Sequence, residues 1–410
     1  MRGSDRNLPP GWWIGKWLVF LGASLVVFCY GLHFDTFVIL LGLLWLLFRL
    51  ASPANAITFS VVLALMTLCL WGGIELLGLN KPFYRLHEKL AYFDREMGFS
   101  TYQKNVSASM EMPFGDLRAM SSHMPPLEAP RTISCQTDSL GFRNTQDYHG
   151  QPFLVVGDSF VVGVGNTQSQ TLDRQLADRY GMQAYNLGHP GDASDYLQRI
   201  QYFRAHFSER PKFLVFLFEG NDFPAKDRPI APQSWLRTLK ENYALLSKNR
   251  FSNFITMKRN QIKVRRKNQD PGQDPAGSFM VGDREMAYYK LYRENTERTH
   301  YVFPPGYVAD LRLLLQLSHK VFFIPTKYRV YGPESTLPPQ AYWERLNQVC
   351  QEAGTPCINL TAPMQIQARH HLEQGQTLWW RDDTHWNPLG IAVAAEVVWQ
   401  TAGRSIHKTP

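Results

Sequence analysis

Three short segments of the chain carry the side chains that a serine nucleophile needs in order to attack an ester. A serine hydroxyl is a weak nucleophile by itself, because its proton must leave as the new bond forms. A histidine that accepts the proton, oriented by a carboxylate, supplies this activation. All three residue types occur in the segments Gly157-Asp158-Ser159, Gly220-Asn221-Asp222 and Asp382-Asp383-Thr384-His385. Their combination predicts acyl transfer through a covalent acyl-serine.

The residue types assign a role to each side chain. Ser159 is the predicted nucleophile, and His385 is the predicted base that takes the proton and later returns it. Two carboxylates, Asp382 and Asp383, precede the histidine, and the residues alone do not decide which of them orients the imidazole. Each segment taken singly is also compatible with ordinary turn chemistry, since Gly, Asn, Asp and Ser dominate turns. Their occurrence together favours the catalytic interpretation.

The predicted elements place these residues at the ends of strands. An apolar run at 153–156 precedes Ser159, and the glycine before the serine permits a sharp turn into a helix. A second apolar strand at 212–218 precedes Asn221, and Gly191 follows a third, shorter strand. Ligands bind beyond the carboxyl ends of the strands in open α/β sheets. We therefore expect the N–H groups of Ser159 and Gly191 and the side-chain amide of Asn221 to stabilise the oxyanion.

Strand-like runs alternate with helical stretches along the rest of the chain. The predicted strands are 153–156, 184–187, 212–218, 321–325 and 357–360. The predicted helices lie near 169–180, 194–206, 307–319, 339–353 and 388–402. This alternation is typical of an α/β protein with a doubly wound parallel sheet flanked by helices.

Four blocks of the chain together resemble the SGNH (GDSL) hydrolase superfamily. They are the GDS that ends at Ser159, the Gly191 of NLGHPGD, the GND around Asn221 and the DDTHWNPLG around His385, and they occur in that superfamily's order. The resemblance covers about residues 150–222 and 305–405. It implies a flavodoxin-like sheet and a Ser-His-Asp site that moves acyl groups to or from sugar hydroxyls.

A narrower resemblance concerns IPTKYRVYG and the ending DTHWNP, which look similar to membrane-associated acetyltransferases of the alginate type. The general superfamily pattern implies Asp382 as the acid, whereas the alginate-type pattern implies Asp383, which we favour slightly. The resemblance implies acetyl transfer to a hydroxyl of an envelope or secreted polysaccharide, with a membrane-bound partner that delivers the acyl group. Two alternatives stay open: a carbohydrate esterase (deacetylase) with the same site, and a non-catalytic polysaccharide-binding scaffold. No cofactor is expected.

Three uncharged apolar runs, at 17–32, 36–48 and 51–74, occupy the first fifth of the chain. About 20 apolar residues span a bilayer, so the third run is long enough and the first nearly so. We expect three transmembrane helices within 1–79, with two as an alternative. Basic residues precede the first run and follow the second, which predicts a cytoplasmic amino terminus. The catalytic domain then faces the periplasm or the exterior from a bacterial inner membrane.

The remaining segments complete the predicted organisation. Residues 80–150 form a membrane-proximal connecting region, with an interfacial helix near 81–93. Residues 151–405 form the catalytic domain, interrupted by a basic insertion at about 223–304. The stretch 226–267 holds twelve Lys or Arg residues and two acidic ones, in a chain of net charge +8. It suits a membrane surface, an acidic polysaccharide or a solvated helix, and nucleic acid is not expected.

The five cysteines predict no metal site, because their spacing does not resemble that of zinc ligands. Cys350 and Cys357 are close enough in sequence to bridge in an oxidising compartment. A bridge between them requires a short distance between the two Cα atoms.

Overall fold

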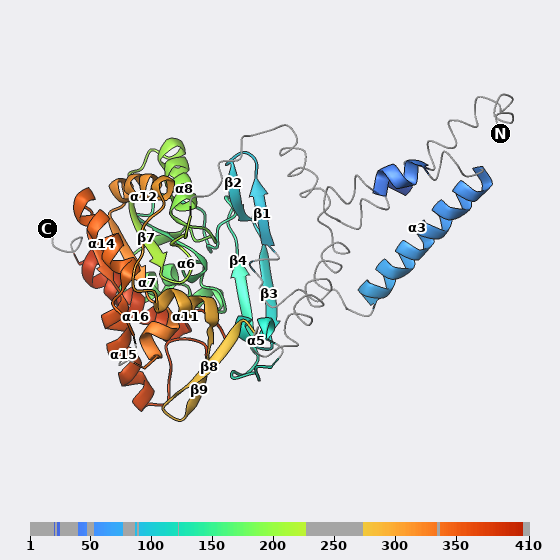
Figure 1. Cartoon of the computed structure of the whole chain (residues 1–410). Coiled ribbons are helices and arrows are strands. Elements are labelled where there is room, and N and C mark those ends of the chain that lie inside the picture. Colours follow the sequence, from blue (N-terminus) through green and yellow to red (C-terminus); the bar gives the residue numbers. More distant parts are fainter. Residues whose placement is uncertain are drawn as a thin grey trace. The chain divides into compact units, whose positions relative to one another are not determined.

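The structure of the 410-residue chain is a computed structural model (Figure 1). It describes residues 20, 23–24, 40–46, 53–76, 87, 90–121, 123–226, 274–333 and 337–404. The chain divides into two compact units, and the larger one contains residues 83–229 and 267–410. The larger unit holds all the candidate site residues.

The described part of the smaller unit includes helix α3 (Pro53–Leu76), which covers most of the third apolar run. The run at 17–32 lies mostly outside the described residues, and the run at 36–48 is described at 40–46. Within the described residues, no helix combines the length and the apolar character needed to cross a membrane. The transmembrane helices therefore stay a prediction.

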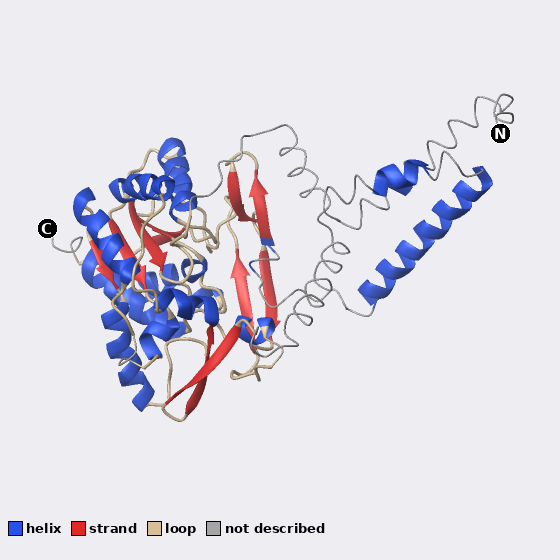
Figure 2. Cartoon of the chain, viewed as in Figure 1, coloured by secondary structure: helices blue, strands red, loops and turns tan. Residues whose placement is uncertain are grey.

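A five-stranded parallel sheet, in the order β11-β10-β7-β5-β6, forms the centre of the larger unit (Figure 2). Its strands are β5 (Phe153–Val156), β6 (Ala184–Asn186), β7 (Lys212–Phe218), β10 (Lys320–Ile324) and β11 (Cys357–Asn359). The chain runs outward from β5 to β6 and then crosses back to β7 on the other side of β5. The strand order reverses there, and such reversals form the crevice in which doubly wound sheets bind ligands.

Alternating residues of the central strands face two separate cores, as the pleat of a strand requires. In β7, Val215 and Leu217 belong to one core cluster, whereas Leu214 and Phe216 belong to the other. All four side chains are fully buried. A strand that is buried on both faces has a continuous apolar sequence, which is why 212–218 could be predicted.

Helices cover both faces of the sheet (Figure 1). One core includes residues of α8 (Ala193–His206), α12 (Pro305–Leu317) and α14 (Ala341–Ala353). The other includes residues of α6 (Ser159–Val162), α7 (Leu172–Tyr180), α13 (Lys327–Tyr331), α15 (Thr361–Glu373) and α16 (Pro388–Val398). The prediction of a doubly wound parallel α/β sheet flanked by helices is confirmed.

Three small antiparallel sheets were not predicted. They comprise β1 (Ala91–Asp94) with β2 (Phe99–Tyr102), β3 (Ser107–Met112) with β4 (Arg131–Gln136), and β8 (Ala276–Val281) with β9 (Arg284–Tyr289). Two short helices accompany them, α5 (Asp116–Met120) and α11 (Lys290–Thr296). Residues 91–94 form a strand, so the expectation of an interfacial helix near 81–93 is wrong at the end of that stretch. The rest of that stretch lies almost wholly outside the described residues.

Most of the segment expected as a membrane-proximal connecting region, 80–150, belongs to the same compact unit as the sheet, which includes residues 83–150. A buried guanidinium holds the two parts together. Arg143 donates to the carbonyls of Val162 and Gly163 at 2.9 Å each and to those of Ser134 and Asn166 at 2.8 Å each. A buried charge is tolerated when it is hydrogen-bonded in this way.

Cys350 and Cys357 form a disulfide, with their Cα atoms 6.1 Å apart. The bridge joins the last turn of α14 to the first residue of β11. Cys135 and Cys69 are free among the described residues. Most of the predicted basic insertion lies outside the described residues, and its described end forms the hairpin β8–β9 and helix α11.

Candidate active site

Ser159 is the first residue of α6, immediately beyond the carboxyl end of β5. Asp158 caps this helix, and its carboxylate accepts the N–H of Phe160 at 2.9 Å. Gly157 is needed in the turn, because a Cβ there would lie 2.6 Å from Val161 and 3.2 Å from the carbonyl oxygen of Phe216. The strand, turn and helix expected from the sequence thus place the serine at the edge of the sheet where ligands bind.

An unbroken chain of hydrogen bonds runs from Ser159 to a carboxylate. Ser159 Oγ lies 2.8 Å from His385 Nε2, and His385 Nδ1 lies 2.7 Å from Asp383 Oδ1. The backbone N–H of His385 also donates to Asp383 Oδ1, at 3.1 Å. Because Nδ1 carries the proton that the carboxylate accepts, Nε2 is left to accept the serine proton. Asp383 is fully buried and His385 nearly so.

Asp382 is also buried, but it occupies a different position. The structure joins Asp383, and not Asp382, to the imidazole. Burial raises the pKa of the Asp382 carboxyl, and its neighbours include the Gly115 backbone. The carbonyl of Asp382 accepts the N–H of Leu117 at 3.0 Å. Of the two candidate acids, only Asp383 has the geometry of a triad member.

A further carboxylate, which the sequence analysis missed, lies beside the same imidazole. Asp116 Oδ2 is 3.7 Å from His385 Nδ1, and Asp116 is fully buried. Its two oxygens accept the backbone N–H of Thr384 at 2.7 Å and the Thr384 hydroxyl at 2.6 Å. It is a lone acidic residue far from the other segments, so no spacing in the sequence marked it.

Two cations that the sequence analysis also missed balance these carboxylates. Arg131 of β4 donates to Asp383 Oδ2 at 3.4 Å and lies over the ring of Trp380, 4.0 Å from the centroid. Lys327 of α13 donates to the carbonyls of Ala287 at 2.9 Å and Trp380 at 2.8 Å. Burial lowers the pKa of Lys327 to about 8, although the nearby carboxylates, Asp383 first, oppose this shift.

The predicted oxyanion donors Gly191 and Asn221 lie on the two loops that flank the serine. Gly191 lies between β6 and α8, and Asn221 follows β7, and both strands are neighbours of β5. The loop after β7 is well supported, because Asn295 of α11 donates to the Gly220 carbonyl at 2.7 Å. Asn221 itself is exposed. Its amide forms no hydrogen bond with the other described residues.

Asp158, next to the serine, and Asp222 are buried carboxylates that interact with each other. Asp222 accepts the N–H of Phe218 at 2.9 Å and the hydroxyl of Tyr196 at 3.0 Å. Burial raises the pKa of Asp158 to about 6, and burial together with the charge of Asp158 raises the pKa of Asp222 well above its usual range. Two close carboxyls resist ionising together, so this part of the site holds a proton more readily than an exposed pair.

One group of described residues could approach a single metal ion, namely Asp116, Asp383 and His385, whose ligand atoms lie within 4.8 Å of one another. However, His385 Nδ1 and Asp383 Oδ1 already form a hydrogen bond at 2.7 Å. Arg131 also approaches Asp383 with its own positive charge. The group is therefore better suited to hydrogen bonding than to a cation.

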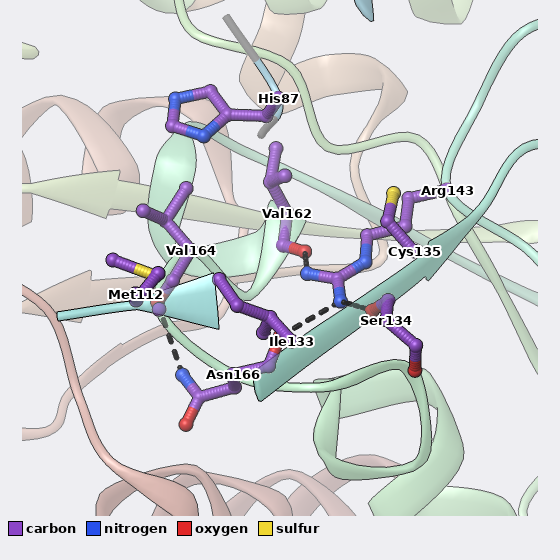
Figure 3. Close-up of a pocket in the computed structure, with 10 residues that line it drawn as sticks. His87, Met112, Ile133, Ser134, Cys135, Arg143, Val162, Val164 and Asn166 are labelled. Carbon is purple, nitrogen blue, oxygen red and sulfur yellow. Dashed lines mark hydrogen bonds between the residues drawn. The ribbon is translucent and has the colours of Figure 1, made fainter. Parts of the chain in front are cut away.

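A small cavity lies behind the serine helix, between β3, β4 and the loop after α6 (Figure 3). Arg143, Cys135 and Val162 are among its lining residues, and the Arg143 guanidinium reaches the Val162 carbonyl beside it. Its volume of about 20 Å³ is room for about one water molecule. Ser159 does not line it, so this cavity is not where an acyl group would bind.

The α/β fold and the serine hydrogen-bonded to a histidine are typical of proteins that transfer acyl groups through a serine. Residues 155–393, more than half of the chain, match the model of the GDSL-like Lipase/Acylhydrolase family. The chain belongs to this family, which confirms the SGNH (GDSL) resemblance and makes it an enzyme of the esterase or acyl-transferase type. No curated protein matches the chain. The narrower resemblance to alginate-type acetyltransferases receives no support and stays a prediction.

Proposed function

We propose that the chain transfers acyl groups through a covalent ester on Ser159. The observation that carries this proposal is the hydrogen-bond chain from Asp383 through His385 Nε2 to Ser159 Oγ, with distances of 2.7 Å and 2.8 Å. A serine in such a chain is activated as a nucleophile, because a base is in place to take its proton.

In the first half-reaction, Ser159 Oγ bonds to the carbonyl carbon of the donor ester while His385 Nε2 takes the hydroxyl proton. Asp383 stabilises the imidazolium that forms. The carbonyl oxygen becomes an oxyanion, for which the N–H groups of Ser159 and Gly191 and the Asn221 amide are the proposed donors. The intermediate then collapses, the bond to the leaving oxygen breaks, and His385 returns its proton to that oxygen.

In the second half-reaction, an acceptor hydroxyl takes the place of the leaving group. His385 Nε2 removes its proton, the acceptor oxygen bonds to the acyl carbon, and Ser159 leaves with the proton that His385 gives back. If the acceptor is a sugar, the enzyme is a transferase, and if it is water, the enzyme is an esterase. The same residues perform both reactions.

We further propose that the acyl group is acetyl and that the acceptor is a hydroxyl of an envelope or secreted polysaccharide. The basic stretch at 226–267 supports an acidic polymer as substrate, because clustered positive charge raises the local concentration of anions. A membrane-bound protein that delivers the acyl group completes this proposal. The partner rests on the sequence resemblance alone.

We also propose that the catalytic domain is anchored at the bacterial inner membrane and faces the periplasm or the exterior. Helix α3 supports attachment to lipid, because Leu65, Met66 and Leu68 are each more than half exposed. The Cys350–Cys357 disulfide supports an oxidising compartment. Alkaline carbonate extraction of membranes tests the anchor, and release of the chain into the soluble fraction would contradict it.

Mass spectrometry after incubation with an activated acetyl ester tests the proposed chemistry. We expect an acetyl adduct on Ser159 in the wild type and none in Ser159→Ala. Faster loss of the adduct when oligosaccharide is added, with acetylated sugar as product, identifies a transferase. Loss to water alone identifies an esterase, and no adduct with any acetyl donor would favour the scaffold alternative.

A further inference from the structure

Asp116 comes from a part of the chain that lies outside the matched family segment, yet it is buried in the candidate site. It is the first residue of α5, on the connection between β3 and β4. Its backbone N–H donates to Asp383 Oδ2 at 3.3 Å. Residues 155–393 therefore do not contain everything that surrounds the imidazole.

The start of α5 fits closely against the loop that carries the histidine. The carbonyl of Asp382 accepts the N–H of Leu117 at 3.0 Å. A Cβ at Gly115 would lie 2.3 Å from that same carbonyl oxygen. Only glycine permits this approach without displacement of one of the two segments. Asp116 is thus held in place by backbone contacts on both of its sides.

Thr384 connects Asp116 to the imidazole. Its hydroxyl lies 2.6 Å from Asp116 Oδ2 and 3.2 Å from His385 Nδ1. The carboxylate can only accept, so the hydroxyl proton points to Asp116 and a lone pair is left for the Nδ1–H. Asp383 accepts from the same Nδ1–H. Both contacts therefore favour the tautomer in which Nε2 is free to take the serine proton.

The negative charge of Asp116 supports the same proton transfer, from Ser159 to His385, that this tautomer permits. A carboxylate oxygen 3.7 Å from Nδ1 stabilises the imidazolium that forms when Ser159 loses its proton. Several charged groups surround the imidazole: Asp382 and Asp383 on its own loop, Asp116 from α5, Asp158 from the turn after β5, Arg131 from β4 and Lys327 from α13. Of these, only Asp116 and Asp383 form an ion-pair contact with the imidazole.

We propose that Asp116 is a second carboxylate of this site, a positioning residue that fixes the His385 tautomer through Thr384 and stabilises the imidazolium. This inference rests on the proposed acyl-serine function. It assigns a role in catalysis to the region before β5, which was expected only as a membrane-proximal connecting region.

The test is the rate at which an activated acetyl ester acylates Ser159, measured against pH in the full chain. Asp116→Asn keeps the size of the side chain and removes its charge. We expect acylation to slow about 10- to 100-fold, at or below the low end of the roughly 10²- to 10⁴-fold that a side chain transferring the proton itself contributes. We also expect the acid limb of the pH profile to move about one unit lower, because a negative charge beside the base has been removed.

Thr384→Val is the second variant, because it removes the hydroxyl and leaves Asp116 charged. We expect it to slow acylation less than Asp116→Asn does, and to move the acid limb less. Asp382→Asn is the matched control, since it removes a neighbouring buried carboxylate that does not contact the imidazole. Its acid limb should move less than that of Asp116→Asn. Thermal unfolding of each variant shows whether a slower rate reflects loss of the fold.

An unchanged rate and pH profile in Asp116→Asn would overturn the proposal. If Asp116→Asn does not fold, wild-type behaviour in Thr384→Val overturns it equally, because the path through the hydroxyl would then be dispensable. Failure of the underlying function looks different, since the wild type itself would then form no acetyl adduct on Ser159.

Discussion

The serine side and the acid side of the site are built in different ways. On the serine side, Asp158, which caps α6, and Ser159, which begins it, are consecutive residues that follow one strand. On the acid side, the loop around Asp383 is held by α5, β4, β9 and α13, which come from distant parts of the chain. A nucleophile can thus be presented by local structure alone, whereas its base and acid depend on tertiary contacts.

The largest expected effect distinguishes the two aspartates of the acid side. Asp383→Asn should lower the rate of Ser159 acylation about 10⁴-fold, because an asparagine supports the wrong tautomer of the histidine. Asp382→Asn should lower it by about tenfold or less, since its side chain does not contact the imidazole. Single-turnover acylation with an activated ester measures both. The reverse order would show that the loop adopts a different arrangement during catalysis.

Lys327→Met tests whether the stability and activity of the acid side depend on this buried cation. The variant leaves three buried carboxylates without this cation, so we expect the free energy of unfolding to fall by about 3 to 5 kcal/mol. Activity of the folded fraction should fall about 10- to 100-fold as the catalytic loop moves. Lys320→Met, at the first residue of β10, is the control and should change stability by about 0.5 kcal/mol or less. Equal effects of the two substitutions would contradict this view of the acid side.

Asp158→Asn tests the serine side and should have the smallest effect on activity, because asparagine caps helices nearly as well as aspartate. The folded protein keeps the Asp158 proton up to about pH 6, whereas the ordinary pKa is 3.8. The unfolded chain therefore loses the proton first, and stability falls as the pH rises from about 4 to 6. We expect this fall, about 1 to 3 kcal/mol, to shrink in the variant. Denaturant unfolding at several pH values measures it, and an identical pH dependence in both proteins would refute the assignment.

The difference between the two sides also explains what the sequence could predict. The inner strands β5, β7 and β10 of the parallel sheet were recognisable because both of their faces are buried, as in the continuous apolar run of β7. Ser159 and His385 could be found because each lies in a short polar segment at the end of an element. Asp116, Arg131 and Lys327 could not, because their role depends on contacts between residues far apart in the chain.

The choice between Asp382 and Asp383 illustrates the same limit. Adjacent residues in a tight loop point in different directions, and the residue that faces the imidazole depends on how the loop is held. Here Leu117 and Gly115 of the α5 region contact Asp382, and that packing leaves Asp383 beside the histidine. The residue types within the segment Asp382–His385 do not carry this information, and only the narrower alginate-type resemblance pointed to Asp383.

The sequence separation within the site also implies an order of events during synthesis. Ser159 and His385 are 226 residues apart, and Asp116 and Thr384 are 268 residues apart. A ribosome makes a chain from its amino terminus, so the serine and Asp116 leave the exit tunnel long before their partners exist. Until the loop with His385 arrives, the serine has no base and cannot attack esters. The proposed acyl-transfer site is therefore expected to assemble only after the loop with His385 has been synthesised.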